Sequence, residues 1–338
     1  ILIKSGQALE AAYQLDTIVL DKTGTITVGK PSLTDLLPLS DLNRSDLLQL
    51  IASAEQHSEH PLAQAILEAA KEEGLDLLPV SHFEAMVGRG LSAQVEDKRL
   101  LIGNESLMKE KNIDSSAFQE QLLELSQEGK PAMFVAIDGQ LVGILAVADE
   151  MKSSSLKAVQ ELQSMGLEVI MLTGDREETA TAIAQKAGIQ KVIAGVLPDG
   201  KATAIKDLQE TGKKLAMVGD GINDAPALVQ ADVGIAIGSG ADVAIESADV
   251  VLMHSDLQDV VKAIKLSQAT IRNIKENLFW AFAYNTLGIP IAMGLLHLFG
   301  GPLLNPMLAG LAMSLSSVSV VVNALRLGRF KMKKYTEE

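Results

Sequence analysis

The chain has 338 residues, of which 47% are hydrophobic and 3% aromatic, and its formal net charge is −14. This length predicts two or three domains, and the negative charge argues against nucleic acid as a partner. The residues include no cysteine, which excludes a disulfide or a thiolate metal ligand within them.

The first predicted element is a short buried strand that ends in an aspartate. The apolar run 17–20 leads directly into Asp21, and residues 21–27 read DKTGTIT. Open α/β sheets place their chemistry at the carboxyl ends of strands, where an aspartate can attack phosphorus and form an aspartyl phosphate. A surface turn rich in Thr and Gly is the plainer interpretation. The heptapeptide, however, resembles the phosphorylation sequence of P-type ATPases.

The residue two positions after Asp21 separates two kinds of relative. The broader group that the motif resembles, the haloacid-dehalogenase-type phosphatases, usually has a second aspartate there as general acid and base. This chain has Thr23 instead. Without that carboxylate water is poorly activated, so an aspartyl phosphate should persist. This suits a pump and does not suit a simple phosphatase.

Residues 31–145 interrupt an alternation of strands and helices and predict an inserted α+β domain. Pro31 opens the insert, and a domain of this size can fold on its own. Antiparallel strands are expected at 80–86, 91–96, 98–102, 132–138 and 141–147.

The insert contains the string EQHSEHPLA at residues 55–63. Ser58 is expected to cap a helix whose first turn holds Pro61, which would place His60 at the helix mouth, where its ring can face a purine. Taken alone, a histidine at a helix start is usually an ordinary surface residue. The Ser-Glu-His-Pro-Leu segment resembles the nucleotide-binding domain of heavy-metal-transporting P-type ATPases. That resemblance implies adenosine contacts from Glu55, His60, Gly88, Gly90, Gly103 and Asn104.

After the insert, the alternation resumes and predicts a parallel sheet. Strands are expected at 168–172, 192–195, 215–218, 233–237 and 250–252, with helices between them that end at glycines such as Gly166 and Gly188. The first of these strands ends in Thr173, Gly174 and Asp175. The threonine hydroxyl and a neighbouring amide can donate hydrogen bonds to phosphoryl oxygens.

Two further segments supply charge of both signs. Lys201 lies where a helix begins and can offset negative charge on a transferring phosphoryl group. The strand at 215–218 runs into GDGIND, in which Asp220 and Asp224 are suited to Mg²⁺. In this order, DKTGT, TGD and GDGIND complete the resemblance to the phosphorylation domain of P-type ATPases.

That resemblance implies a role for each residue. Mg²⁺ would be held by Asp21 and Asp220, with the Thr23 carbonyl as a third ligand and Asp224 in support. The phosphoryl group would be oriented and neutralised by Thr173, Gly174, Lys201 and Asn223. The motifs add Lys22 and Asp175 as catalytic positions.

Residues 277–325 contain no Asp, Glu, Lys or Arg. The turn at 300–302 divides them into 278–299 and 303–325, and each segment is long enough to cross a hydrocarbon core of about 30 Å. Basic residues flank only the outer ends, which predicts that both ends are cytoplasmic. A buried helical hairpin of a soluble domain is the alternative. The flanking residues are Arg272, Lys275, Arg326, Arg329, Lys331, Lys333 and Lys334.

Four residues of this hairpin are candidate ligands for a transported metal: Tyr284, Asn285, Met313 and Ser317. An asparagine in a membrane span is costly without a partner, and a methionine thioether favours Cu(I). Physics alone favours a simpler role, in which the polar groups join helices and the methionine fills space. The pairing of Tyr-Asn with MSLSS resembles the copper-exporting branch of the family. Zinc- and cadmium-type relatives typically place a carboxylate in the last span, and this chain has none there.

Residues 1–6 resemble the segment just after the fourth core helix of the family. The resemblance therefore implies that other parts lie before it, on the same or another chain: an actuator domain and a Cys-Pro-Cys helix. A copper chaperone and membrane lipid are further expected partners.

The predicted fold is α/β: a dehalogenase-like, parallel-sheet phosphorylation domain (1–30 and 146–268), an inserted α+β nucleotide-binding domain (31–145), and a two-helix transmembrane hairpin with a basic cytoplasmic tail (269–338). The predicted function is ATP-driven export of Cu(I) through an aspartyl phosphate, with ATP and Mg²⁺ as cofactors. We expect a multi-pass membrane protein with cytoplasmic catalytic domains, in the cell membrane if the source is bacterial. The alternatives are a transporter of Ag(I) or a divalent metal, and a membrane-anchored dehalogenase-type phosphatase.

Overall fold

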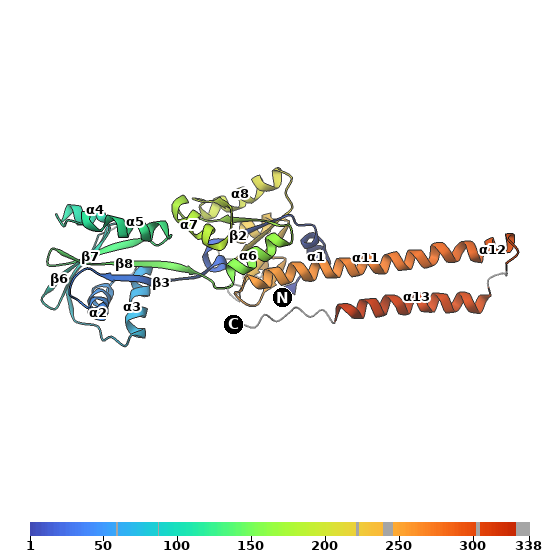
Figure 1. The fold of residues 1–338 in the computed structure, drawn as a ribbon, viewed down its shortest axis with the longest axis horizontal. Helices are drawn as coiled ribbons and strands as arrows, with labels where there is room; N and C mark the ends of the chain where they lie inside the picture. Colours follow the sequence, from blue (N-terminus) through green and yellow to red (C-terminus); the bar gives the residue numbers. More distant parts are fainter. Residues whose placement is uncertain (59, 87, 221–222, 239–245, 302–304, 329–338) are drawn as a thin grey trace.

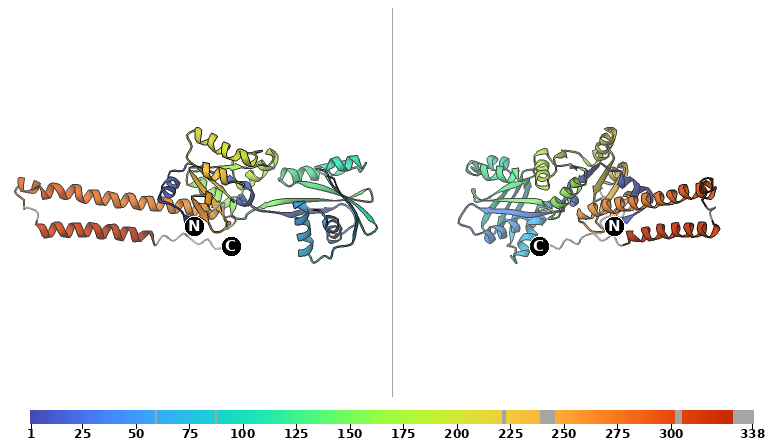
Figure 2. Two further views of the ribbon diagram at one scale, coloured as in Figure 1. Left: turned by 180° about the vertical axis from the view of Figure 1, so that it is seen from behind. Right: turned by 45° about the vertical axis from the view of Figure 1, so that its right-hand side comes forward.

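The computed structural model describes residues 1–338 except 59, 87, 221–222, 239–245, 302–304 and 329–338. An α/β body lies in the middle of the molecule, with the insert on one side and a pair of long helices on the other (Figure 1). The views in Figure 2 show the same linear arrangement. The α/β class predicted from the sequence is confirmed.

The α/β body is built on a seven-stranded sheet with β2 near its centre. The strand order is β1-β13-β12-β11-β2-β9-β10, and every pair is parallel except β1 with β13. The strands are β1 (Leu2–Ile3), β2 (Thr17–Asp21), β9 (Glu168–Leu172), β10 (Lys191–Ile193), β11 (Leu215–Gly219), β12 (Val233–Ile237) and β13 (Val250–Leu252).

Helices cover both faces of this sheet, which is why its strands are almost entirely apolar. One face packs against α1 (Gly6–Tyr13), α6 (Ser155–Ser164), α7 (Glu177–Ala187) and the start of α11 (Gln258–Ala292). The other face packs against α8 (Pro198–Glu210) and α9 (Ala225–Gln230). The predicted strands of this half agree with the structure to within two residues at each end.

The insert has a separate six-stranded antiparallel sheet in the order β3-β8-β7-β6-β5-β4. Its strands are β3 (Thr27–Pro38), β4 (Val80–Met86), β5 (Gly90–Val95), β6 (Lys98–Gly103), β7 (Ala132–Ile137) and β8 (Gln140–Met151). One face is covered by α2 (Arg44–Glu55) and α3 (Pro61–Glu72). The other is covered by α4 (Glu105–Glu110), the short helix η2 (Ser116–Phe118) and α5 (Gln119–Gln127).

Strands β3 and β8 form a two-stranded ribbon, which we call the hinge ribbon. Thr27 pairs with Met151 at the end near the α/β body, and Pro38 pairs with Gly143 within the insert. The sequence analysis did not predict β3, because Gly29 and Pro31 interrupt its apolar pattern. The structure accommodates this proline because β3 lies at an edge of the sheet, where a missing N–H donor is tolerated.

The last elements are α11, α12 (Leu295–Leu298) and α13 (Pro306–Leu327). Helix α11 begins against the α/β core and continues outward, and α13 returns beside it (Figure 1). Asn273 Nδ2 donates to the Asn323 carbonyl at 2.8 Å, and Asn323 Nδ2 donates to Asn277 Oδ1 at 2.9 Å, so a polar cluster joins the two helices.

A helical hairpin is therefore present, but its first helix begins well before the predicted residue 278. Of the helices in the described part of the chain, none combines the length and the apolar character that a membrane crossing needs. The two membrane spans predicted from the sequence are thus not confirmed.

Candidate functional site

The site is centred on Asp21, the last residue of the central strand β2. Lys201, in the first turn of α8, places its Nζ 2.6 Å from Asp21 Oδ1 and 2.6 Å from Asp224 Oδ1. All three side chains are buried. One ammonium group thus bridges two carboxylates from different strand ends, and we call this arrangement the Lys201 bridge.

The electrostatics of the bridge leave excess negative charge around Asp21. The pKa of Asp21 is raised to about 7: burial is the largest cause, the nearby carboxylates of Asp224 and Asp220 add to it, and the Lys201 ammonium opposes it. Burial lowers the pKa of Lys201, but attraction to Asp21 and Asp224 outweighs it and raises this pKa above the usual value. A single shared ammonium cannot neutralise both of its partners.

Two glycines permit the close approach of the loops around Asp21. A Cβ on Gly219 would lie 2.3 Å from Asp224 Oδ2, so only glycine allows this carboxylate to pack against the end of β11. Gly24 has φ +70, and a Cβ there would lie 3.1 Å from Asp220 Oδ2. The loop after Asp21 therefore rests directly against Asp220.

The end of β9 contributes a second pair of charges. Lys22 Nζ lies 2.6 Å from Asp175 Oδ2, and both belong to motifs identified in the sequence. The buried hydroxyl of Thr173 accepts a hydrogen bond from the Asp175 amide at 3.2 Å, and Gly174 lies between them. Asn223 is exposed. The structure thus brings the DKTGT and TGD segments, and Asp220 and Asp224 of the third motif, to one edge of the sheet.

The donor set beside Asp21 fits Mg²⁺. Asp21 and Asp220 are hard oxygen donors, and Asp220 is close enough to raise the pKa of Asp21, so a divalent cation would relieve their repulsion. Within the described residues, no three His, Cys, Asp or Glu side chains gather into a group that could hold a metal alone. The predicted Thr23 carbonyl and phosphate oxygens would have to complete the coordination.

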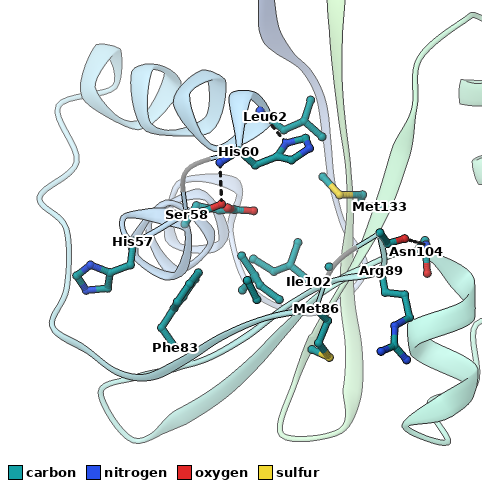
Figure 3. Close-up of a pocket in the computed structure, with 15 residues that line it drawn as sticks. His57, Ser58, His60, Leu62, Phe83, Met86, Arg89, Ile102, Asn104 and Met133 are labelled. Atoms are coloured by element: carbon teal, nitrogen blue, oxygen red, sulfur yellow. Dashed lines mark hydrogen bonds between the residues drawn. The ribbon is translucent and has the colours of Figure 1, made fainter. Parts of the chain in front are cut away.

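The insert contains a cavity of about 730 Å³ between α2, α3 and the strands β4 to β6 (Figure 3). This volume is within the range of small-molecule sites. Five of the six predicted adenosine-contacting residues line the cavity: Glu55, His60, Gly88, Gly90 and Asn104. Gly103 lies behind the lining, where a Cβ would be 2.3 Å from the Arg89 carbonyl.

His60 has a structural role that the sequence analysis assigned to another residue. It is the N-cap of α3, and its Nδ1 accepts a hydrogen bond from the Leu62 amide at 3.2 Å. Ser58 instead accepts from the His60 amide at 3.4 Å, so the predicted cap at Ser58 is wrong. The preference for Ser at N-caps suggested Ser58, but Pro61 is the first helical residue, which leaves the cap position to His60.

Glu55 ends α2 at the edge of this cavity and is buried. Burial raises its pKa, and a hydrogen bond from Ser58 opposes the change. The cavity therefore combines apolar walls with a carboxyl group and an imidazole, which is a surface suited to a heterocyclic base.

The four candidate metal positions lie on the hairpin. Tyr284 and Asn285 are on α11 and Ser317 is on α13. Asn285 Nδ2 donates to the Ala281 carbonyl at 2.9 Å, one turn earlier in the same helix. Met313 is within α13, but its side chain lies outside the described residues.

Sequence reasoning missed the polar residues at the base of the hinge ribbon. Asp149 accepts hydrogen bonds from Thr27 Oγ1 at 2.5 Å and the Gly29 amide at 2.8 Å, and Lys152 lies three residues further on. Charged residues at the end of a long apolar strand, where the insert rejoins the sheet, were the available signal.

A family model described as haloacid dehalogenase-like hydrolase matches residues 15–232. The chain is also 52% identical, over 98% of its length, to the copper-exporting P-type ATPase of Bacillus subtilis. This chain belongs to the P-type ATPases. It spans about 40% of the length of that curated relative.

Solved P-type ATPases share this fold. A crystal structure of a zinc-transporting PIB-type ATPase in the E2.Pi state matches with a TM-score of 0.84 and 39% identity, and the match covers 96% of this chain and 52% of that one. The catalytic domain of the CPx-ATPase CopB-B matches with a TM-score of 0.58 and 30% identity, and covers 78% of this chain and 95% of that one.

The first testable prediction concerns the charge of Asp21. In the unfolded chain its pKa is near the ordinary 3.8, whereas in the folded chain it is about 7. The folded state therefore binds the proton more tightly, and stability falls as the pH rises from 4 through 7. In buffer without divalent cations, Asp21→Asn should stabilise the chain by about 2 to 4 kcal/mol at pH 8 and by little at pH 4.

Calorimetric melting over this pH range measures the difference. Asp207→Asn on the exposed surface of α8 is the control, and should show no such pH dependence. An Asp21→Asn variant that is less stable than the parent at pH 8 would contradict the charge balance of the Lys201 bridge.

The second prediction separates the two roles of His60. His60→Asn keeps a good N-cap but removes the ring, so it should weaken ATP binding by about three- to ten-fold with little change in melting. His60→Ala should weaken binding similarly and also destabilise the insert by about 1 kcal/mol. Titration calorimetry and thermal melting test this, with Lys71→Ala, at an exposed position of α3, as control. Unchanged ATP affinity in His60→Asn would exclude a contact between the ring and the base.

Proposed function

We propose that this chain is the catalytic part of a P-type ATPase that exports Cu(I), and that Asp21 is phosphorylated by ATP bound to the insert. The observation that carries the proposal is the Lys201 bridge: a buried aspartate at the carboxyl edge of a parallel sheet, whose charge one shared ammonium offsets only in part. The cavity beside His60 supports it as the place where the nucleotide base binds.

In this mechanism an ionised oxygen of Asp21 attacks the γ-phosphorus of ATP. A bond forms between this oxygen and phosphorus, and the bond from phosphorus to the β,γ-bridging oxygen breaks, so that ADP leaves. Lys201 offsets the charge on the transferring group, and the Thr173 hydroxyl and nearby amides orient its oxygens. Bound Mg²⁺ would supply further charge neutralisation between Asp21, Asp220 and the phosphate.

The transfer requires movement of the insert. The cavity belongs to the insert and Asp21 belongs to the α/β body, and the hinge ribbon connects them (Figure 1). Bending of this ribbon would carry the triphosphate toward Asp21. The contact of Lys186 Nζ with the Glu128 carbonyl at 3.0 Å shows that the end of α5 already touches α7 in the described arrangement.

A phosphatase of the dehalogenase type is the second candidate within the family. Thr23 argues against it, because a threonine hydroxyl cannot serve as the general base that activates water. The nucleotide-sized cavity in the insert argues against it as well.

We further propose that the hairpin belongs to a membrane-embedded helix bundle. Its outer surface exposes many large apolar side chains, which in water would favour association with lipid or with other helices. Earlier helices of the complete protein, on the same or another chain, would cover part of this surface. The exposed residues include Leu278, Phe279, Trp280, Phe282, Leu287, Ile289, Met293, Leu298, Phe299, Met307, Val318, Val321, Val322 and Leu325.

Cu(I) is the favoured cargo among soft and divalent metals. The hairpin offers the thioether of Met313 with oxygen groups from Tyr284, Asn285 and Ser317 and, in residues 277–325, no carboxylate, and this donor set suits Cu(I) better than Zn²⁺. Curated relatives are named copper-exporting, whereas the solved structure with a TM-score of 0.84 is titled zinc-transporting. A Cys-Pro-Cys helix of the kind that the family resemblance implies would supply most of the affinity, and a copper chaperone would deliver the ion.

The third prediction tests the phosphoryl transfer. Incubation of the full chain with γ-labelled ATP and Mg²⁺ should give a protein-bound label that survives acid and is released by hydroxylamine, as expected for an acyl phosphate. Asp21→Asn should abolish the label and leave ATP binding nearly intact, and Asp220→Ala should prevent labelling at millimolar Mg²⁺. A wild-type level of label in Asp21→Asn would overturn the proposed function.

The fourth prediction tests the metal. Competition of the detergent-solubilised chain against a Cu(I) chelator should show weak Cu(I) binding that is lost in Met313→Ala and kept in Met307→Ala, its matched control. Zn²⁺ should bind no better to the parent chain than to Met313→Ala. Tight Cu(I) binding that survives Met313→Ala, or preferential binding of Zn²⁺, would contradict the assignment.

A further inference from the structure

Lys152 follows directly after β8, and it contacts two segments that are far from it in the sequence. Its Nζ donates to the Gly24 carbonyl at 2.5 Å and to Ser255 Oγ at 2.8 Å. Its own backbone amide donates to the Ile26 carbonyl at 3.0 Å. One residue thus joins the end of the hinge ribbon, the loop after Asp21, and the segment before α11.

The contact with Gly24 reaches the reacting groups indirectly. Gly24 lies in the loop between Asp21 and Ile26 and packs against Asp220, since a Cβ there would be 3.1 Å from Asp220 Oδ2. A displaced Gly24 carbonyl would move this loop, and with it the Thr23 carbonyl, relative to Asp220. The distance between the Thr23 carbonyl and Asp220, two of the predicted Mg²⁺ ligands, therefore depends on the position of this loop.

The contact with Ser255 reaches the hairpin. Ser255 lies between β13 and α11, and the first turns of α11 are anchored in the core by Leu257, Val260 and Val261. Helix α11 begins three residues after Ser255 and continues without interruption into the hairpin, so a shift at Ser255 would move the start of that helix. The end of the hinge ribbon that precedes Lys152 is also held in place, because Asp149 on β8 accepts hydrogen bonds from Thr27 and Gly29 on β3.

The surroundings of the Lys152 ammonium indicate a precise position rather than simple charge pairing. Its two hydrogen-bond acceptors at Gly24 and Ser255 are neutral. Burial lowers the pKa of Lys152, and the carboxylates of Asp256, Asp149 and Asp220 oppose this change. The two hydrogen bonds fix the Lys152 ammonium between the Gly24 carbonyl and the Ser255 hydroxyl, so a shift of either group would break one of them.

We propose that Lys152 is a positioning residue that holds the Asp21 loop against Asp220 and ties this loop to the hinge ribbon and to the root of α11. A movement of the Asp21 loop on phosphorylation would then be transmitted through Lys152 to the start of α11, and so to the hairpin. The inference rests on the proposed function for its kinetic test and on the structure alone for its second test.

The kinetic test compares Lys152→Met, Lys152→Arg and Lys206→Met in the full chain. Lys206 is an exposed lysine on α8 and serves as the control. At saturating ATP, labelling of Lys152→Met should be slower by about ten- to a hundred-fold, because small misplacements of reacting groups cost this much. Its ATP affinity and melting temperature should match those of the control, and Lys152→Arg should recover part of the rate.

Ser255→Ala gives a complementary measurement. If Lys152 acts through Ser255 and Gly24 together, Ser255→Ala should slow labelling in the parent and have little further effect in Lys152→Met. A wild-type labelling rate in Lys152→Met, or a loss of rate that follows a loss of ATP affinity, would overturn the proposal.

Hydrogen exchange provides the test that needs no phosphorylation. Lys152→Met should speed amide exchange both in residues 22–26 and in residues 253–257, whereas Lys206→Met should change neither. Faster exchange in only one of the two segments, or in neither, would show that Lys152 does not join them. A parent chain that takes no label would overturn the proposed function alone, and this exchange result would still decide the role of Lys152.

Discussion

The Lys201 bridge is the interaction on which the site depends. A carboxylate buried at the end of β2 is unstable as an ion, and Lys201 makes its charge tolerable while sharing itself with Asp224. The remaining repulsion of Asp21 by Asp224 and Asp220 favours the binding of a further positively charged group beside Asp21. Both Mg²⁺ and the electrophilic phosphorus of ATP meet that need, so the same imbalance that weakens the folded state prepares the aspartate for its reaction.

The sequence was sufficient for the parts of the fold that depend on local pattern. Strands β2 and β11 are fully buried and β9 nearly so, and each of the three leads directly into a motif, so parallel pairing alone brings Asp21, Thr173 and Asp220 to one edge. Strand β3 was not predicted because its own residues carry no clear strand pattern, and it is extended because it pairs with β8. The prediction of Ser58 as the N-cap was wrong because several polar residues precede α3, and the helix begins at Pro61, which makes His60 the cap residue.

The contacts of Lys152 and Asp149 could not be predicted, because they join segments separated by more than a hundred residues and follow no motif. The membrane spans are a different case. A run of residues without charge suggested two crossings, whereas α11 starts inside the α/β core and includes charged turns before the apolar segment. The uncharged run falls within α11 and α13, but α11 begins at Gln258, well before the predicted start at residue 278.

The hinge ribbon also has a consequence for how the chain folds. Thr17 on β2 pairs with Glu168 on β9, although the whole insert lies between them in the sequence. Closing so long a loop is entropically unfavourable and slow. Once the insert has folded, however, Thr27 and Met151 are already neighbours, and only residues 22–26 and 152–167 remain between this pair and the strands β2 and β9. An insert that folds first would thus act as an internal template, because it would bring together the two segments from which the central pair of the parallel sheet assembles.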